Sequence, residues 1–329
     1  MLKSSIPSIA FVASAVVASA LFVFVSPEAL AWGRRGHQIV ADVAVSLLSH
    51  RDVLDGGAPF LKQHGFDLAY YANVPDLVWK KPETYQIEWI NHFMDLEVFE
   101  GQAGKAPPFE LDRAAFDAAY PGIKREAGRA WWRIRELDAR LEEIAVRLRA
   151  LPGDAPRTDR QKLQVQWLSL AGEIGHYVGD MSQPLHCTEN YDGQETGQKG
   201  LHAFYEDKVV DELYPELTVL ALTIARAGQR ADRARSKNMS VLQVVRRLTE
   251  GSRADLATIL RLDKTLGRTD MAKAKRAYKD QIARRLAAGG LALAELWSRR
   301  LGWRYDGEKF YDFLTQPEYV VPPGPAPAR

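Results

Sequence analysis

Apolar residues recur every three or four positions along most of this chain, which is the spacing of a helix with one buried face. One such run begins just after His37 and extends to Leu47. A longer run, from Arg125 to Leu151, ends at Pro152-Gly153 because proline cannot continue a helix. Both segments are therefore predicted to be amphipathic helices.

Further helices are predicted from about Arg160 to Met181, from near Leu201, and from Pro215 to about Leu301. Between Tyr85 and Trp89 apolar and polar residues alternate, which predicts a short extended segment that delivers His92. No segment repeats at a fixed period. We therefore expect an all-α fold with a single mainly helical domain.

The first 31 residues have the pattern of a secretory signal peptide. Lys3 is followed by an apolar run from Ile9 to Val25, and Ala29-Leu30-Ala31 has the small residues of a cleavage site. Cleavage would export the protein to the periplasm or the medium and leave Trp32 as its first residue. Since the apolar run is long for a signal peptide, an uncleaved membrane anchor is the alternative.

The mature domain is predicted to span residues 32–316. Residues 317–329 are rich in proline and are predicted to form a mobile tail.

The charge of the chain does not by itself indicate a partner, because a formal net charge of +2 is too small. Between Arg226 and Arg304, however, about twenty lysines and arginines stand against about seven acidic residues. Such a block would attract polyanions if it lay on one face. The basic residues are instead spread around the predicted helices without interleaved aromatic residues, which favours solvated outer faces.

Cys187 is the only cysteine. An internal disulfide and zinc–thiolate sites are therefore excluded, so any metal must be held by histidine, carboxylate or main-chain groups.

Histidine and carboxylate residues gather in one short stretch. His176 and Asp180 are four residues apart, as are His202 and Glu206, so each pair projects from one face of a helix and can share a cation. His186 lies between the pairs, after the break at Pro184. One His-x-x-x-Asp pair is more often a surface ion pair, but two pairs with a histidine between them indicate metal binding.

The predicted N-terminus adds a further chelating group. A free α-amino group and the carbonyl oxygen of the same residue form a five-membered ring with a metal, and cleavage would create that pair at Trp32. His37 follows five residues later. Taken alone, His37 is more typical of a histidine at a helix start.

Five segments together resemble the superfamily of single-strand-specific zinc nucleases and bacterial zinc phospholipase C. They are Trp32-Gly33-x-x-Gly36-His37, Asp76, His92-Phe93-Met94-Asp95, Gly179-Asp180-Met181-Ser182-Gln183-Pro184-Leu185-His186, and His202-x-x-x-Glu206. The resemblance covers Trp32 to about Asp211 and leaves the C-terminal helices unmatched.

The resemblance implies a helical fold around three zinc ions. The implied ligands are Asp76, His92, His176 and Asp180 for the first ion, Asp180, His37 and the main-chain amino and carbonyl groups of Trp32 for the second, and His186, His202 and Glu206 for the third. A bridged zinc pair lowers the pKa of a water molecule from about 15.7 toward about 7, which makes a nucleophile available at neutral pH. Asp180 would bridge the pair, and Asp76 is a candidate to orient the water.

The resemblance leaves the substrate open. Phe93 lies where the nucleases stack a base, with Asp95 placed to bond the edge of that base, although an aromatic residue next to His92 is equally consistent with core packing. The nucleases generally have an arginine three residues after the aspartate, where this chain has Trp79. If the adjacent Lys80 took its place, an ammonium point charge would replace the guanidinium that clamps the phosphate.

The surroundings of the third-zinc ligands look more like phospholipase C. Arg35, however, stands where that branch uses an acidic residue to hold choline.

We therefore expect an exported nuclease or 3′-nucleotidase that cleaves single-stranded DNA or RNA to 5′-phosphates, with no obligate protein partner implied. Phospholipase C acting on phospholipid head groups is the alternative, and a non-catalytic zinc-binding protein is the second. His50 and His64 are expected to be ordinary surface residues.

Overall fold

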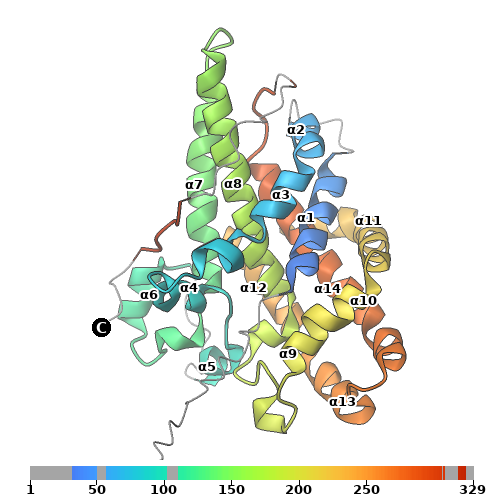
Figure 1. Ribbon diagram of the computed structural model, residues 1–329. Helices are drawn as coiled ribbons and strands as arrows, with labels where there is room; N and C mark the ends of the chain where they lie inside the picture. Colours follow the sequence, from blue (N-terminus) through green and yellow to red (C-terminus); the bar gives the residue numbers. More distant parts are fainter. Residues whose placement is uncertain (1–31, 50–56, 102–109, 306, 308–317, 324–329) are drawn as a thin grey trace, which may run out of the picture.

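The computed structural model describes residues 32–49, 57–101, 110–305, 307 and 318–323. Every regular element in these ranges is helical, so the predicted all-α class is confirmed (Figure 1). The elements that carry most of the fold are α1 (Arg34–Leu48), α3 (Gly65–Tyr71), α7 (Ala130–Ala150), α8 (Arg157–Ser182), α11 (Glu216–Ser236), α12 (Val241–Arg253), α13 (Leu256–Leu266) and α14 (Met271–Arg299). The predicted signal peptide and His50 lie outside the described residues.

Helices α7 and α8 form an antiparallel hairpin whose tip projects beyond the neighbouring helices in Figure 1. The turn between them contains Pro152 and Gly153, as the sequence predicted. Helix α8 continues into the body of the protein, where its C-terminal half is buried from Ala171 to Ser182. This burial on all sides explains why α8 has no clear polar face, and it places the His176–Asp180 pair in the interior.

Helices α1 and α14 pack closely because α14 has two glycines at their contact. A Cβ atom added at Gly290 would lie 2.3 Å from Cγ1 of Val43, and one added at Gly289 would meet Ser182 at 2.9 Å. Such distances are too short for any side chain. The two glycines therefore let α14 approach both α1 and α8, the helices that bear metal-ligand candidates.

Two predicted boundaries shift by about a turn. Helix α1 begins at Arg34 rather than after His37, so His37 lies within its first turns. Helix α7 begins at Ala130, after a separate 3-10 turn at Arg125–Ala127.

The extended segment predicted from Tyr85 to Trp89 is wrong. These residues form helix α4 (Tyr85–Glu88), which continues into the 3-10 turn η2 (Trp89–Asn91). The alternation suggested that the apolar residues face inward, but the fully buried residue is Glu88. Because a buried carboxylate has partners in the interior, a polar residue here faces inward, the reverse of the expected pattern. A run of five residues is also too short to distinguish a strand from one helical turn.

The described part of the predicted tail is packed against the body. Tyr319 is half-buried, and its ring lies 5.5 Å from the Trp79 ring in an edge-on contact. Pro322 is buried as well. Residues 318–323 therefore contact the body through an aromatic side chain, while the mobility of the tail stays a prediction.

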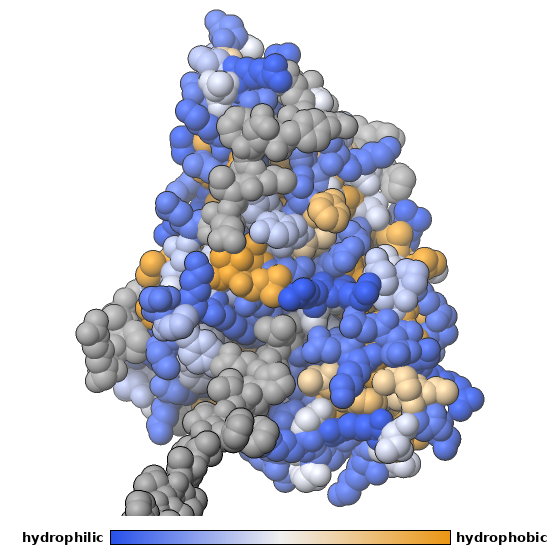
Figure 2. Space-filling model, in the orientation of Figure 1, coloured by the Kyte–Doolittle hydropathy of each residue, from blue (hydrophilic) through white to orange (hydrophobic). Residues whose placement is uncertain are grey.

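The surface view is mainly hydrophilic, with small separated hydrophobic patches (Figure 2). Many basic residues of the C-terminal helices form ion pairs, among them Arg268 with Asp263 and Lys279 with Glu216. This agrees with solvated outer faces rather than one basic stripe. Within the described ranges, no helix combines the length and apolarity needed to cross a bilayer.

Candidate metal centre

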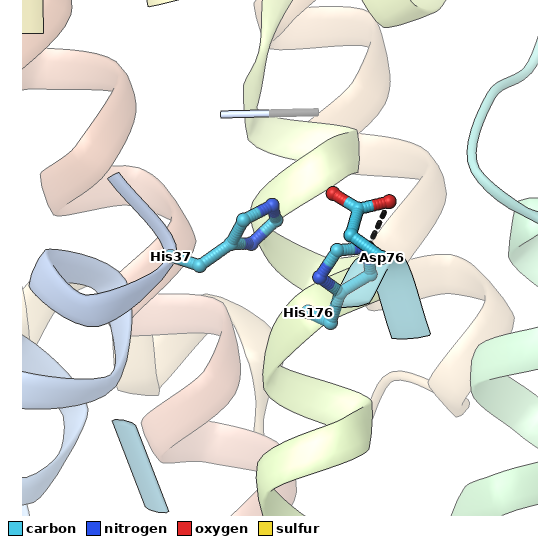
Figure 3. A group of neighbouring side chains, drawn as sticks. All are labelled: His37, Asp76 and His176. Atoms are coloured by element: carbon cyan, nitrogen blue, oxygen red, sulfur yellow. Dashed lines mark ion pairs between the residues drawn. The ribbon is translucent and has the colours of Figure 1, made fainter. Parts of the chain in front are cut away.

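The first group of metal-ligand candidates, here called the inner cluster, lies between α1, α8 and two short elements. Its members are His37 from α1, Asp76 from the π-helical turn η1 (Pro75–Trp79), His92 after η2, and His176 and Asp180 from α8. Within it, His37, Asp76 and His176 form one set of possible ligands, and His92, His176 and Asp180 form another. His176 is common to both sets. Figure 3 shows the side chains of His37 and Asp76 directed toward that of His176.

The distances in the inner cluster suit ligands gathered around cations. Nδ1 of His92 lies 3.0 Å from Nε2 of His176 and 3.1 Å from Oδ2 of Asp180. Oδ1 of Asp76 lies 3.7 Å from both of these ring nitrogens. Nε2 of His37 lies 3.5 Å from the other oxygen of Asp180, Oδ1. Asp180 therefore presents Oδ2 to His92 and Oδ1 to His37, which is the arrangement that a bridging carboxylate needs.

A glycine on α8 makes room for His37. A Cβ atom at Gly179 would lie 2.6 Å from Nδ1 of His37, so no other residue fits without displacing the ring. The His37 ring stacks on that of His176 with the centroids 4.0 Å apart. The sequence Gly179-Asp180 thus combines a contact that requires glycine with the carboxylate that follows it.

The second group, here called the outer cluster, follows the end of α8. It consists of His186 from the 3-10 turn η4 (Pro184–Cys187), His202 from α9 (Leu201–Ala203) and Glu206 from the π-helical turn η6 (Phe204–Lys208). The Nε2 atoms of the two histidines are 3.1 Å apart, and Oε2 of Glu206 lies 2.7 Å from that of His202. These atoms are as close as ligands of one ion.

Most of these imidazole rings have one nitrogen occupied by a protein group and the other facing a cluster. Nδ1 of His176 faces the carbonyl oxygen of Ala72 at 2.8 Å, and Nδ1 of His186 faces that of His92 at 2.6 Å. Nδ1 of His202 lies 3.1 Å from the carbonyl oxygen of Tyr191. Donation to these carbonyls fixes a tautomer in which Nε2 carries the lone pair, which is the form that binds a metal.

Burial favours neutral histidines here. It lowers the pKa of His92, His176 and His186 well below the ordinary value, with nearby positive groups adding to the effect. Burial also lowers the pKa of His202, but the carboxylate of Glu206 outweighs that effect and raises it. The neutral imidazoles are ready to bind a cation without first losing a proton.

The carboxylates of the two clusters include oxygens that the protein does not satisfy. Oδ1 of Asp180 and Oε1 of Glu206 are buried and accept no hydrogen bond from the described residues. Burial and the neighbouring Asp76 raise the pKa of Asp180 well above its ordinary value, and burial raises that of Glu206 to about 7. Buried carboxylates of this kind are normally paired or coordinate a metal. The residues present therefore fit divalent cations.

Trp32 is fully buried next to the inner cluster. Its indole nitrogen donates a 2.8 Å hydrogen bond to the hydroxyl of Ser182, two residues after Asp180, and its ring lies 5.6 Å from that of Tyr205. A Cβ atom at Gly36 would meet Trp32 at 2.7 Å. The side chain thus fixes residue 32 beside α8. Chelation by its main chain remains a prediction.

A pocket of about 490 Å³ opens beside the clusters. His92, His186 and His202 line it, together with the three residues that the sequence proposed for substrate binding, Lys80, Phe93 and Asp95. Phe93 is half-buried and packs on Trp89 at 5.3 Å between ring centroids, so it has both a packing contact and a face toward the pocket.

Lys80 and Asp95 give the pocket two different ionisable groups. Nζ of Lys80 lies 2.6 Å from Oδ1 of Asp76. Burial raises the pKa of Asp76, but Lys80, His92 and His37 together outweigh burial and hold that pKa below its ordinary value. Burial, reinforced by Glu97 and Glu189, raises the pKa of Asp95 to about 8. At neutral pH Asp95 therefore offers a proton-bearing carboxyl to the pocket.

Two site residues escaped the sequence interpretation. Glu88 is fully buried, and its Oε1 lies 3.3 Å from Nε2 of His92. Its four-residue spacing to His92 was a detectable signal, which the predicted strand concealed. Gln183 donates a 2.9 Å hydrogen bond to Glu206, and its role depends on the bend at Pro184 that brings distant segments together.

His64 is not the surface residue that we expected. Only 4% of it is exposed. Its Nδ1 lies 2.8 Å from Oδ2 of Asp67, and its ring packs on Phe60. Both partners lie within four residues of His64, so helical spacing was a local signal of this packing.

Comparison with known proteins gives one distant similarity. No family model matches the chain. A probable serine protease of Bradyrhizobium tropiciagri is 25% identical over 223 residues, which cover 49% of this chain and 27% of that protein. The chain thus spans about a quarter of the length of the curated relative it matches.

This finding contradicts the expected function. A nuclease or phospholipase C cleaves phosphodiesters, whereas the relative is named as a protease, so the expected nuclease or phospholipase function is corrected. The sequence interpretation chose a substrate from a family resemblance around the clusters, and such a resemblance does not by itself determine which bond is cleaved.

Several buried serines are engaged within the helices. The hydroxyl of Ser182 donates to the carbonyl oxygen of Gly179, and that of Ser252 donates to the carbonyl oxygen of Met181. Ser236 likewise donates to the main chain of its own helix. These three hydroxyls are therefore not placed as the nucleophile of a Ser–His pair.

Proposed function

We propose that this protein is a metal-dependent hydrolase whose inner and outer clusters hold divalent cations beside the substrate pocket. The observation that carries the proposal is the convergence of eight buried side chains from distant segments into sets whose ligand atoms lie within 4.8 Å of one another. Nitrogen and oxygen donors with no thiolate suit zinc. Three ions, as the resemblance implies, are the expected number.

Cations bound here would lower the pKa of a water molecule and polarise the bond to be cleaved. The protein supplies the remaining parts. Asp76 and Asp180 present carboxylate oxygens that can orient the water and accept its proton. Lys80 places a positive charge at the pocket wall, where it can stabilise charge that develops on the substrate.

The bond that we propose to be cleaved is an ester. His186, His202 and Lys80 line the pocket, so a cation held by the two histidines and the Lys80 ammonium would place positive charge beside an oxygen leaving group. A peptide bond is the second candidate, and the observation that favours it is the name of the protease relative.

The proposal is tested with the purified protein loaded with zinc. A chromogenic carboxylic ester, a chromogenic phosphate ester and a peptide anilide are offered in parallel, with and without a chelator, and bound zinc is counted by mass spectrometry. We expect ester hydrolysis that the chelator abolishes and zinc restores. Activity that survives chelation but is blocked by a fluorophosphonate, a reagent for nucleophilic serines, would overturn the proposal.

The predicted export, with processing before Trp32, belongs to the same proposal. A main-chain chelate at Trp32 requires a new N-terminus, so cleavage would complete the inner cluster. The test is the N-terminal sequence of the protein isolated from cells together with its zinc content.

A further inference from the structure

Arg133 is fully buried among three aromatic rings. Its guanidinium carbon lies 5.3 Å from the ring centroid of Trp79, 5.5 Å from that of Tyr177 and 5.6 Å from that of Tyr319. The rings come from η1, from α8 and from the C-terminal segment 318–323. Ring faces attract a cation of this kind, but a fully buried guanidinium also needs a carboxylate partner.

That partner is Glu88. Its Oε2 lies 3.4 Å from Nη2 of Arg133, while its Oε1 accepts a hydrogen bond from the hydroxyl of Tyr177 and lies 3.3 Å from Nε2 of His92. The opposite nitrogen of the same ring, Nδ1, faces Asp180 at 3.1 Å. A chain of contacts therefore runs from the aromatic enclosure to the inner cluster.

Glu88 distinguishes His92 from three of the other cluster histidines. His176, His186 and His202 direct Nδ1 to carbonyl oxygens, whereas His92 directs Nε2 to a carboxylate. The Glu88 carboxylate, 3.3 Å from Nε2 of His92, favours a proton on Nε2 and leaves the lone pair on Nδ1, the nitrogen that faces the cluster.

We propose that Glu88 is a positioning residue that orients His92 for metal binding, and that Arg133, Trp79 and Tyr319 hold Glu88 in place. The C-terminal segment thereby becomes part of the support of the metal centre. This inference rests on the metal binding in the proposed function and does not depend on which bond is cleaved.

The first test compares Glu88→Gln with Glu173→Gln. Glu173 is a matched control because it is also a buried glutamate, and its carboxylate accepts a hydrogen bond from Ser169. We expect Glu88→Gln to weaken the binding of one ion by about 10–100-fold in chelator competition. It should also shift the visible absorption of the cobalt-substituted protein, since the orientation of a ligand changes. Glu173→Gln should leave both readouts at their wild-type values.

The second test concerns the C-terminal segment. Tyr319→Ala removes one ring of the enclosure, and Val321→Ala is the control because Val321 is 59% exposed. Tyr319→Ala should weaken the same ion as Glu88→Gln by several-fold and shift the same cobalt band, whereas Val321→Ala should change neither. Tyr319→Phe keeps the ring and should restore most of the affinity.

Wild-type metal affinity and an unchanged cobalt spectrum in Glu88→Gln would overturn the inference. The same result in Tyr319→Ala would show that the C-terminal segment does not support the metal centre. Failure of the wild-type protein to bind metal is a separate result, because it overturns the proposed function itself. Far-UV circular dichroism of the chelated variants separates loss of metal affinity from loss of folding.

Discussion

The two clusters are built in different ways. The inner cluster takes His37, His176 and Asp180 from the long helices α1 and α8, which are held together by close glycine contacts. The outer cluster takes its residues from η4, α9 and η6, which are short and follow one another after α8 ends. Inner-cluster ligands therefore connect parts of the core, whereas outer-cluster ligands mainly connect neighbouring turns.

The clusters also differ in access. His186 and His202 line the pocket, but of the inner cluster only His92 is among the residues that line it. The inner cluster is thus placed to stabilise the fold and the outer cluster to meet the substrate. Mutations in the two clusters should separate these contributions.

The largest effect is expected for His176→Ala, because His176 belongs to both ligand sets of the inner cluster. Loss of metal binding there should lower the free energy of unfolding by about 3 kcal/mol when free zinc is a hundred times the dissociation constant. Turnover should fall by more than about 100-fold. Thermal unfolding, zinc content and ester hydrolysis are measured together.

His64→Gln is the control for His176→Ala, since His64 is also buried but lies away from both clusters. A His176→Ala protein with wild-type melting temperature and zinc content would show that the inner cluster does not stabilise the fold through bound metal.

A smaller loss of stability is expected for His202→Ala. One zinc ion should be lost and turnover should fall by about 100-fold, because a pocket-facing ligand is removed. The melting temperature should fall less than in His176→Ala, since the outer cluster connects only short elements. Equal destabilisation by both variants would show that the outer cluster also holds the core together.

Local spacing explains why much of the candidate site was visible in the sequence. Residues four apart on a helix share a face, so His176 with Asp180 and His202 with Glu206 follow from the chain alone. Glycine next to Asp180 and the break at Pro184 were equally local signals. The long helices followed from apolar spacing in the same way.

Contacts between distant segments were not visible. Nothing local showed that Arg133 would enter an aromatic enclosure closed by Tyr319. A five-residue alternation fits both one helical turn and a strand, and the tertiary partner of Glu88 decides between them. The predicted substrate was wrong for a related reason, because the substrate is chosen by pocket walls that come from several segments.

The main-chain nitrogen of Trp32 can be tested as a ligand of the inner cluster. A protein that begins at Trp32 has a free amine, whereas one that keeps Ala31 has an amide at that nitrogen. We expect the longer protein to bind one inner-cluster ion roughly tenfold more weakly or worse, while the outer-cluster ion is unaffected. Zinc titration of the two proteins by calorimetry measures the difference. Identical titrations would exclude the main chain of Trp32 as a ligand.

The last effect is a pH dependence of stability that Glu173 gives to α8, one turn before His176. Burial raises the pKa of Glu173 from 4.5 to about 7, although a hydrogen bond from Ser169 opposes the shift. Below pH 4.5 the group is protonated in both the folded and the unfolded chain. Between pH 4.5 and 7 the unfolded chain loses the proton while the folded chain keeps it, so stability falls as pH rises, by on the order of 3 kcal/mol. Urea unfolding of the chelated protein should therefore show a steeper loss between pH 4.5 and 7 for wild type than for Glu173→Gln. Parallel curves would mean that the burial of Glu173 gives the long helix of the inner cluster no such cost.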